Sequence, residues 1–97
     1  MVDLDAPLPT FALLARFRVG QADQHAAVEV VRRLLRTADE PFEDVIVERE
    51  DAPGTFYVMA RFVLSSVDGE TAVMGLFETL RSAGLDPDEV WLDAQVA

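Results

Sequence analysis

Few side chains in this sequence could bind or transform a ligand, and the strongest candidates are aromatic residues and arginines. Tyr57 and Trp91 are the only tyrosine and tryptophan. Each offers a ring for stacking together with a polar group. Arg16 and Arg61 could meet the anionic part of a ligand through charge-assisted hydrogen bonds. This inventory suits the recognition of an aromatic or acidic small molecule.

Other chemistries have little support. His25 is the only histidine, and a lone helical histidine is more often a surface residue than a metal ligand or a general base. The acidic residues between positions 86 and 89 lack the spacing and central glycine of a calcium loop. There is no cysteine, and Ser65 and Ser66 have no histidine placed to activate them. We therefore expect no metal and no cofactor, and we assign no catalytic residue.

Hydrophobic periodicity divides the chain into the elements that position these side chains. A period of two indicates strands over residues 10–19, 45–50, 54–65 and 90–96, and a period near 3.6 indicates helices over residues 21–37 and 69–83. Asp68 is the expected N-cap of the second helix, and Gly84 is its expected stop. The buried stripes expected for the helices are Ala27, Val30, Val31, Leu34 and Ala38 in the first and Val73, Leu76, Phe77 and Leu80 in the second. Residues 1–9 are expected to form an extended arm, and residues 10–97 a single domain.

This order predicts an α+β fold of the ferredoxin-like type. A β-α-β-β-α-β chain with right-handed crossovers gives a four-stranded antiparallel sheet with the first and third strands central and both helices on one face. The other face is left open. The side chains expected on it are Ala12, Leu14, Arg16, Arg18, Ile46, Glu48, Tyr57, Met59, Arg61, Val63, Trp91, Asp93 and Gln95.

The arginines of the open face have possible partners within the chain. Glu48 and Asp93 lie on strands that flank those of Arg16 and Arg61. We therefore expect these arginines to form cross-strand ion pairs at least as readily as contacts with a substrate.

Gly75 interrupts a predicted helix, where glycine costs about 1 kcal/mol relative to alanine. It shares a row of small residues with Ala72, Thr79 and Ser82. This row predicts the close approach of another helix.

The open face should be covered by a partner. Tyr57 and Trp91 together bury roughly 300–500 Å², and with aliphatic neighbours the patch reaches the ~300–600 Å² of the largest patch on a typical monomer. A second copy of the chain, a small molecule and single-stranded RNA are the coverings considered. The net charge of -10 repels phosphate backbones and anionic lipids, so neither nucleic acid nor a membrane is expected as a partner.

The location follows from what the sequence lacks. No run approaches the ~18 apolar residues of a membrane span. Residues 1–9 carry acidic residues and no basic residue, which does not fit a secretory signal. We expect a cytoplasmic protein.

Two segments, FALLARFRVGQADQHAAVEVVRRLL and VEREDAPGTFYVMARFVLSS, carry a family resemblance. Over about its first two thirds the chain resembles the antibiotic-biosynthesis-monooxygenase-like dimeric α+β barrels. The resemblance implies a ferredoxin-like subunit that pairs sheet to sheet around a cavity. The segment DEPFEDV lacks the glycine-containing turn of many members, and the second helix lacks their histidine, so no catalytic residue is carried over.

Two functional hypotheses follow. The first is a homodimeric ferredoxin-like binding or interaction module, with a small molecule as a ligand at the sheet face. The alternative is a cofactor-independent monooxygenase or related cavity enzyme acting on an aromatic substrate, so whether the chain is an enzyme stays open. The residues predicted to form the ligand-binding or dimer face are Leu14, Arg16, Tyr57, Met59, Arg61 and Trp91.

Overall fold

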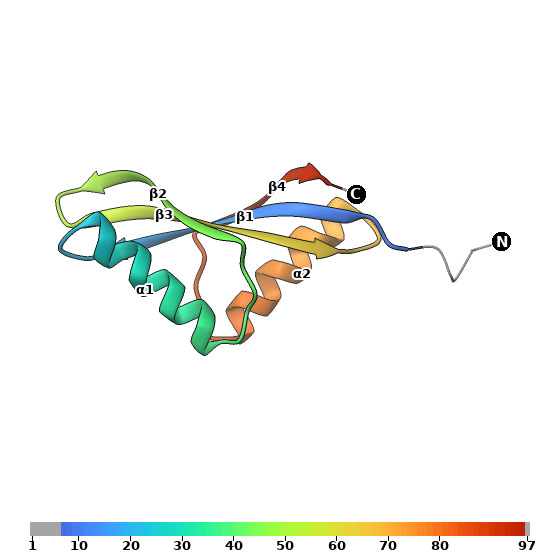
Figure 1. Cartoon of the computed structure of the whole chain (residues 1–97), viewed down its shortest axis with the longest axis horizontal. Coiled ribbons are helices and arrows are strands. Elements are labelled where there is room, and N and C mark those ends of the chain that lie inside the picture. Colours follow the sequence, from blue (N-terminus) through green and yellow to red (C-terminus); the bar gives the residue numbers. More distant parts are fainter. Residues whose placement is uncertain (1–6, 97) are drawn as a thin grey trace.

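A computed structural model describes residues 7–96 of the chain and gives the predicted element order. The elements are β1 (Thr10–Gly20), α1 (Gln24–Thr37), β2 (Asp44–Ala52), β3 (Thr55–Ser65), α2 (Gly69–Ser82) and β4 (Glu89–Gln95). The strands form one antiparallel sheet in the order β2-β3-β1-β4. Both helices lie on the same side of this sheet (Figure 1). The predicted ferredoxin-like α+β fold is confirmed, and most of the predicted arm lies outside the described residues.

Caps and turns fix the ends of the elements. The Asp68 carboxylate accepts a hydrogen bond of 2.7 Å from the Thr71 N–H, which confirms the predicted N-cap of α2. Asp23 caps α1 in the same way, so that helix begins at Gln24 and not at residue 21. Gly84 follows α2 with a φ of +84°, and Gly54 closes the β2–β3 hairpin with a φ of +79°. Glycine adopts this left-handed conformation without the steric cost of a Cβ atom.

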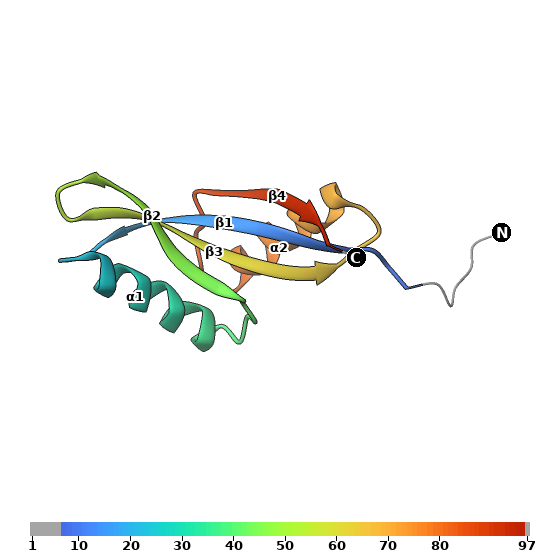
Figure 2. The same ribbon diagram turned by 45° about the horizontal axis from the view of Figure 1, so that its top comes forward.

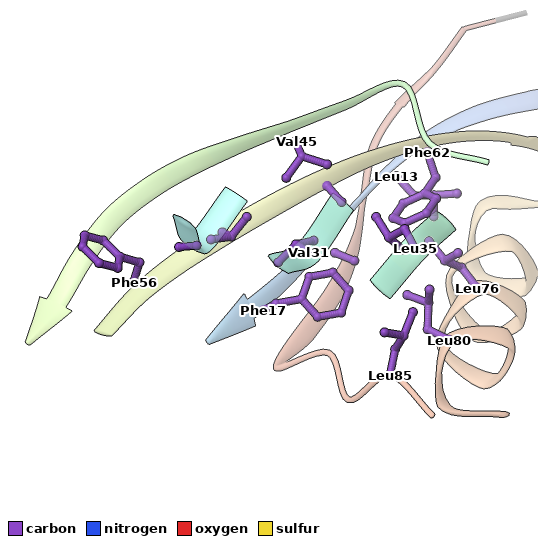
Figure 3. Close-up of a cluster of buried hydrophobic side chains, with 14 of the residues drawn as sticks. Leu13, Phe17, Val31, Leu35, Val45, Phe56, Phe62, Leu76, Leu80 and Leu85 are labelled. Atoms are coloured by element: carbon purple, nitrogen blue, oxygen red, sulfur yellow. The ribbon is translucent and has the colours of Figure 1, made fainter. Parts of the chain in front are cut away.

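The core lies between the sheet and the helices, and the central strands build its sheet side (Figure 3). One side of β1 and one side of β3 are apolar and are buried there except at their ends, and Leu13 and Val58 have no exposed surface. A fully buried leucine or valine contributes about 1.5–3 kcal/mol relative to its exposed state. The helices supply Ala27, Val31, Leu35, Ala72, Leu76 and Leu80.

The helix stripes differ from the prediction by a small rotation. Leu35 is buried in α1, whereas Leu34 was predicted to be buried and is 46% exposed. In α2, Ala72 is buried and Val73 and Phe77 are only partly buried. Neighbouring helical positions differ by about 100°, so the packing against the sheet decides which of two adjacent apolar residues faces inward.

A register shift in β4 corrects a predicted side-chain direction. The pairing of β4 with β1 shifts between Leu92 and Ala94, so Asp93 is an extra residue. Ala94 then pairs with Ala12, and Gln95 pairs with a core residue of β1. Because directly opposed residues share a face, Ala94 lies on the open side, and the prediction that Gln95 lies there is wrong.

The predicted close approach at Gly75 does not occur within the described chain. A Cβ atom built on Gly75 would meet no atom within 4 Å. The two helices diverge from their C-terminal ends in Figure 1, and each packs on the sheet.

Candidate functional site

The face of the sheet without helices brings all six predicted site residues together. The cross-strand rows on this open face are Trp91–Leu14–Arg61–Asp44, Glu89–Arg16–Met59–Ile46 and Arg18–Tyr57–Arg49. Successive rows are two residues apart along β1 and β3, which is about 7 Å, and the extra residue Glu48 lies between the second and third rows on β2. The six residues therefore form one continuous surface.

Arg16 is the centre of this surface. Its guanidinium lies 5.1 Å from the ring centroid of Tyr57 on β3 and 5.8 Å from that of Trp91 on β4. Both distances are within the range of cation–π attraction. The side chain is only 22% exposed, so the two rings and the guanidinium form a packed unit. Tyr57 and Trp91 thus flank an arginine, and the space between them is filled.

Three carboxylates hold this guanidinium. It lies 2.7 Å from Glu89, 3.3 Å from Asp88 and 3.7 Å from Glu48. Desolvation acts to lower the pKa of Arg16, but the charges of Glu48 and Glu89 and the hydrogen bond to Asp88 raise it above its ordinary value. Arg16 is therefore a fixed cation whose charge is balanced inside the chain.

The other arginines of the open face are also paired. Arg61 donates to Glu43. Arg18 and Arg49 each lie 3.3 Å from the carboxylate of Asp51. An anionic ligand would have to displace one of these carboxylates, so the face gives less support to acid binding than the sequence suggested.

The expected ion pairs are partly right. The pair of Arg16 with Glu48 is present, whereas Asp93 is the bulged residue of β4 and pairs with no arginine within the described residues. On the β4 side, Arg16 instead pairs with Glu89, which lies directly opposite it, and with the adjacent Asp88.

Arg49 is the functional candidate that the strand pattern missed. Its guanidinium lies 4.4 Å from the Tyr57 ring centroid and comes from β2, whereas Arg16 comes from β1 on the other side of β3. The pairing of β2 with β3 shifts between Val47 and Arg49, so Glu48 is an extra residue and Arg49 lies opposite Tyr57. The sequence did contain an indication of this bulge. Three consecutive charged residues, Glu48-Arg49-Glu50, break the alternation of apolar and polar side chains that a regular strand shows.

Apolar side chains fill the rest of the face. Ile46 is 49% exposed and Val63 is 38% exposed, while Leu14, Met59 and Trp91 are partly buried. No element of the described chain packs over them, because both helices lie behind the sheet (Figure 1).

The histidine and the metal-binding potential of the described residues were the remaining candidates for chemistry. His25 is exposed and borders a groove between α1 and β2 together with Val28, Glu29 and Ile46. Within residues 7–96, no group of three or more histidine or carboxylate side chains is arranged to hold a metal ion. No described helix is long and apolar enough to cross a membrane.

No protein-family model, curated protein or solved structure matches this chain. The resemblance to the monooxygenase-like dimers therefore stays a prediction.

Proposed function

We propose that the protein is a homodimeric binding or interaction module in which two copies pair through the open faces of their sheets. The observation that supports this most is the band of uncovered apolar side chains on that face, with Met59 at its centre. Apolar surface of this kind on a sheet with helices behind it is typical of a protein interface.

The charges of the face are compatible with burial. Each of its four arginines already has a carboxylate partner in the same chain. Burying a paired charge still costs desolvation energy, but it costs much less than burying a charge that has lost its partner. A second copy could therefore cover Arg16 and the two rings beside it without leaving an isolated cation.

The energetics also allow a dimer. Burying about 400 Å² of apolar surface on each copy would give about 20 kcal/mol at ~25 cal/mol per Å². Association costs about 4–15 kcal/mol in lost freedom. The difference is about 5–16 kcal/mol before the costs of polar desolvation and side-chain ordering, so association is energetically allowed.

The same contacts favour the module over the alternative of a cofactor-independent monooxygenase. In that alternative, Tyr57 and Trp91 would line a cavity that receives an aromatic substrate. The guanidinium of Arg16 lies between the two rings and is held by carboxylates on both sides. A small-molecule ligand of the module would then bind at the rim of this packed unit, between the sheet and its partner.

The test is the mass of the protein in solution. Light scattering across micromolar concentrations should give a dimer, and Met59→Glu should shift it toward the monomer because the new carboxylate would be buried without a partner. We expect the dissociation constant to rise by about tenfold or more, which corresponds to ~1.4 kcal/mol.

Met74→Glu is the matched control. Met74 is 58% exposed on α2, on the other side of the sheet, so the same substitution there should leave the mass unchanged. A monomer at all concentrations, or equal dissociation in both variants, would refute the proposal.

A further inference from the structure

Strand β4 covers only part of the outer edge of β1. The pairing of β1 with β3 continues to Gly20, opposite Thr55, whereas the pairing of β1 with β4 ends at Arg16, opposite Glu89. The last bond on the β4 side joins the Asp88 N–H to the Arg16 carbonyl at 2.7 Å. In Figure 2, β1 runs on past the start of β4. The end of β1 therefore has a neighbouring strand on one side only.

The hydrogen-bonding groups on this open edge follow from strand geometry. Polar backbone groups of alternate residues point to the same side of a strand. Since the Arg16 carbonyl points toward β4, Arg18 and Gly20 direct their N–H and C=O groups to the same side. No backbone bond to either residue on that side is present within residues 7–96.

A cleft lies beside these groups. It has a volume of about 580 Å³ and is lined by Arg18, Gly20, Thr55, Asp86, Pro87 and Asp88. The segment before β4 forms its far wall. An extended peptide could lie in this cleft and bond to β1 as an added strand.

The uncovered end of β1 is more regular than the edge strands β2 and β4. The pairing of β2 contains shifts at Glu48 and Asp51, and that of β4 contains one at Asp93. Bulges of this kind hinder the pairing of a further strand. The pairing of β1 with β3 has no shift, so the groups of Arg18 and Gly20 keep the regular spacing that a new strand needs.

The charged side chains around the cleft indicate which kind of peptide would bind there. Arg18 is already paired with Asp51, whereas Asp86 on the far wall is exposed and has no ion pair within the described chain. The chain carries a net charge of -10, which attracts cations at long range. We propose that the open edge of β1 binds an extended peptide segment with basic side chains. Backbone bonds to Arg18 and Gly20 supply affinity, and the acidic wall supplies the preference for basic residues.

The open edge can be tested in the free protein by amide hydrogen exchange. The N–H groups of Phe17 and Val19 face β3, and those of Arg18 and Gly20 face the cleft. We expect the second pair to exchange at least about tenfold faster. Equally slow exchange would show that the edge is already closed. Protection that grows with protein concentration would show that a second copy occupies it, and either result overturns the proposal.

Peptide binding can be followed by amide shifts in NMR titrations with the capped peptides Ac-TRVRT-NH2 and Ac-TEVET-NH2. We expect shifts at Arg18 and Gly20, with the basic peptide binding about tenfold more tightly. Methylating alternate backbone nitrogens of the basic peptide should abolish binding for one set and preserve it for the other, because only one edge of an added strand faces β1.

Asp86→Asn should weaken the basic peptide severalfold, whereas Asp93→Asn removes the same charge away from the cleft and should have little effect. The proposal fails if neither peptide shifts these amides, if both bind equally, or if the two variants behave alike. Dimer mass is measured in parallel, so failure of this site is distinguished from failure of the proposed dimer.

Discussion

Leu13 and Leu14 are neighbours on β1, and they lie in opposite environments. Leu13 faces the helices and has no exposed surface, whereas Leu14 faces the open side between Trp91 and Arg61 and is only partly buried. The helix-covered face is completed by groups of the same chain. On the open face, the arginines have carboxylate partners within the chain, but several apolar side chains remain exposed to solvent. This difference is the basis of the proposed dimer.

The largest expected effect comes from truncating these two neighbours. Leu13→Ala should lower the free energy of unfolding by about 2–5 kcal/mol because it leaves a cavity in the core. Leu14→Ala should cost less, about 1 kcal/mol at protein concentrations low enough to avoid association, because its side chain is only partly buried. Denaturant titration of both variants gives the comparison. Similar losses would mean that the open face is already packed within one chain.

A smaller effect is expected at Gly75, on the exposed side of α2. Gly75→Ala should raise the free energy of unfolding by about 0.4–1 kcal/mol, because alanine is the better helix former and the new Cβ meets no atom within 4 Å. Gly75→Leu serves as the control for space and should also be tolerated. A loss of stability in both variants would show that a partner packs on this side as well.

The smallest effect concerns the start of α2 at acid pH. The hydrogen bond from the Thr71 N–H lowers the pKa of Asp68 below its ordinary value. A carboxylate whose pKa is lower in the folded state stabilises the protein above its unfolded pKa of about 3.9, and this contribution is lost as the pH falls through the folded value.

Asp68→Asn keeps a capping oxygen but removes this titration. The free energy of unfolding should therefore fall less steeply below about pH 5 in the variant than in the wild type. Denaturant titrations at several pH values provide the measurement. Parallel curves would show that the Asp68 carboxylate does not contribute to acid sensitivity.

Much of the fold could be predicted because it depends on local patterns. Alternation along β1 and β3 assigned the core side and the open side correctly, since successive side chains of a regular strand point in opposite directions. Asp68 and Gly84 marked the ends of α2, since caps act through neighbouring backbone groups. The six predicted face residues share a surface for the same reason.

Tertiary structure alone decided the features that depend on how two elements meet. The bulges at Glu48 and Asp93 arise from pairing with the adjacent strand, and they brought Arg49 to the Tyr57 ring and left Asp93 without an arginine. Packing on the sheet buried Leu35 in place of Leu34. A residue's own neighbours in sequence set its local conformation, but the register and rotation of whole elements minimise the free energy of contacts between distant segments, which no local pattern contains.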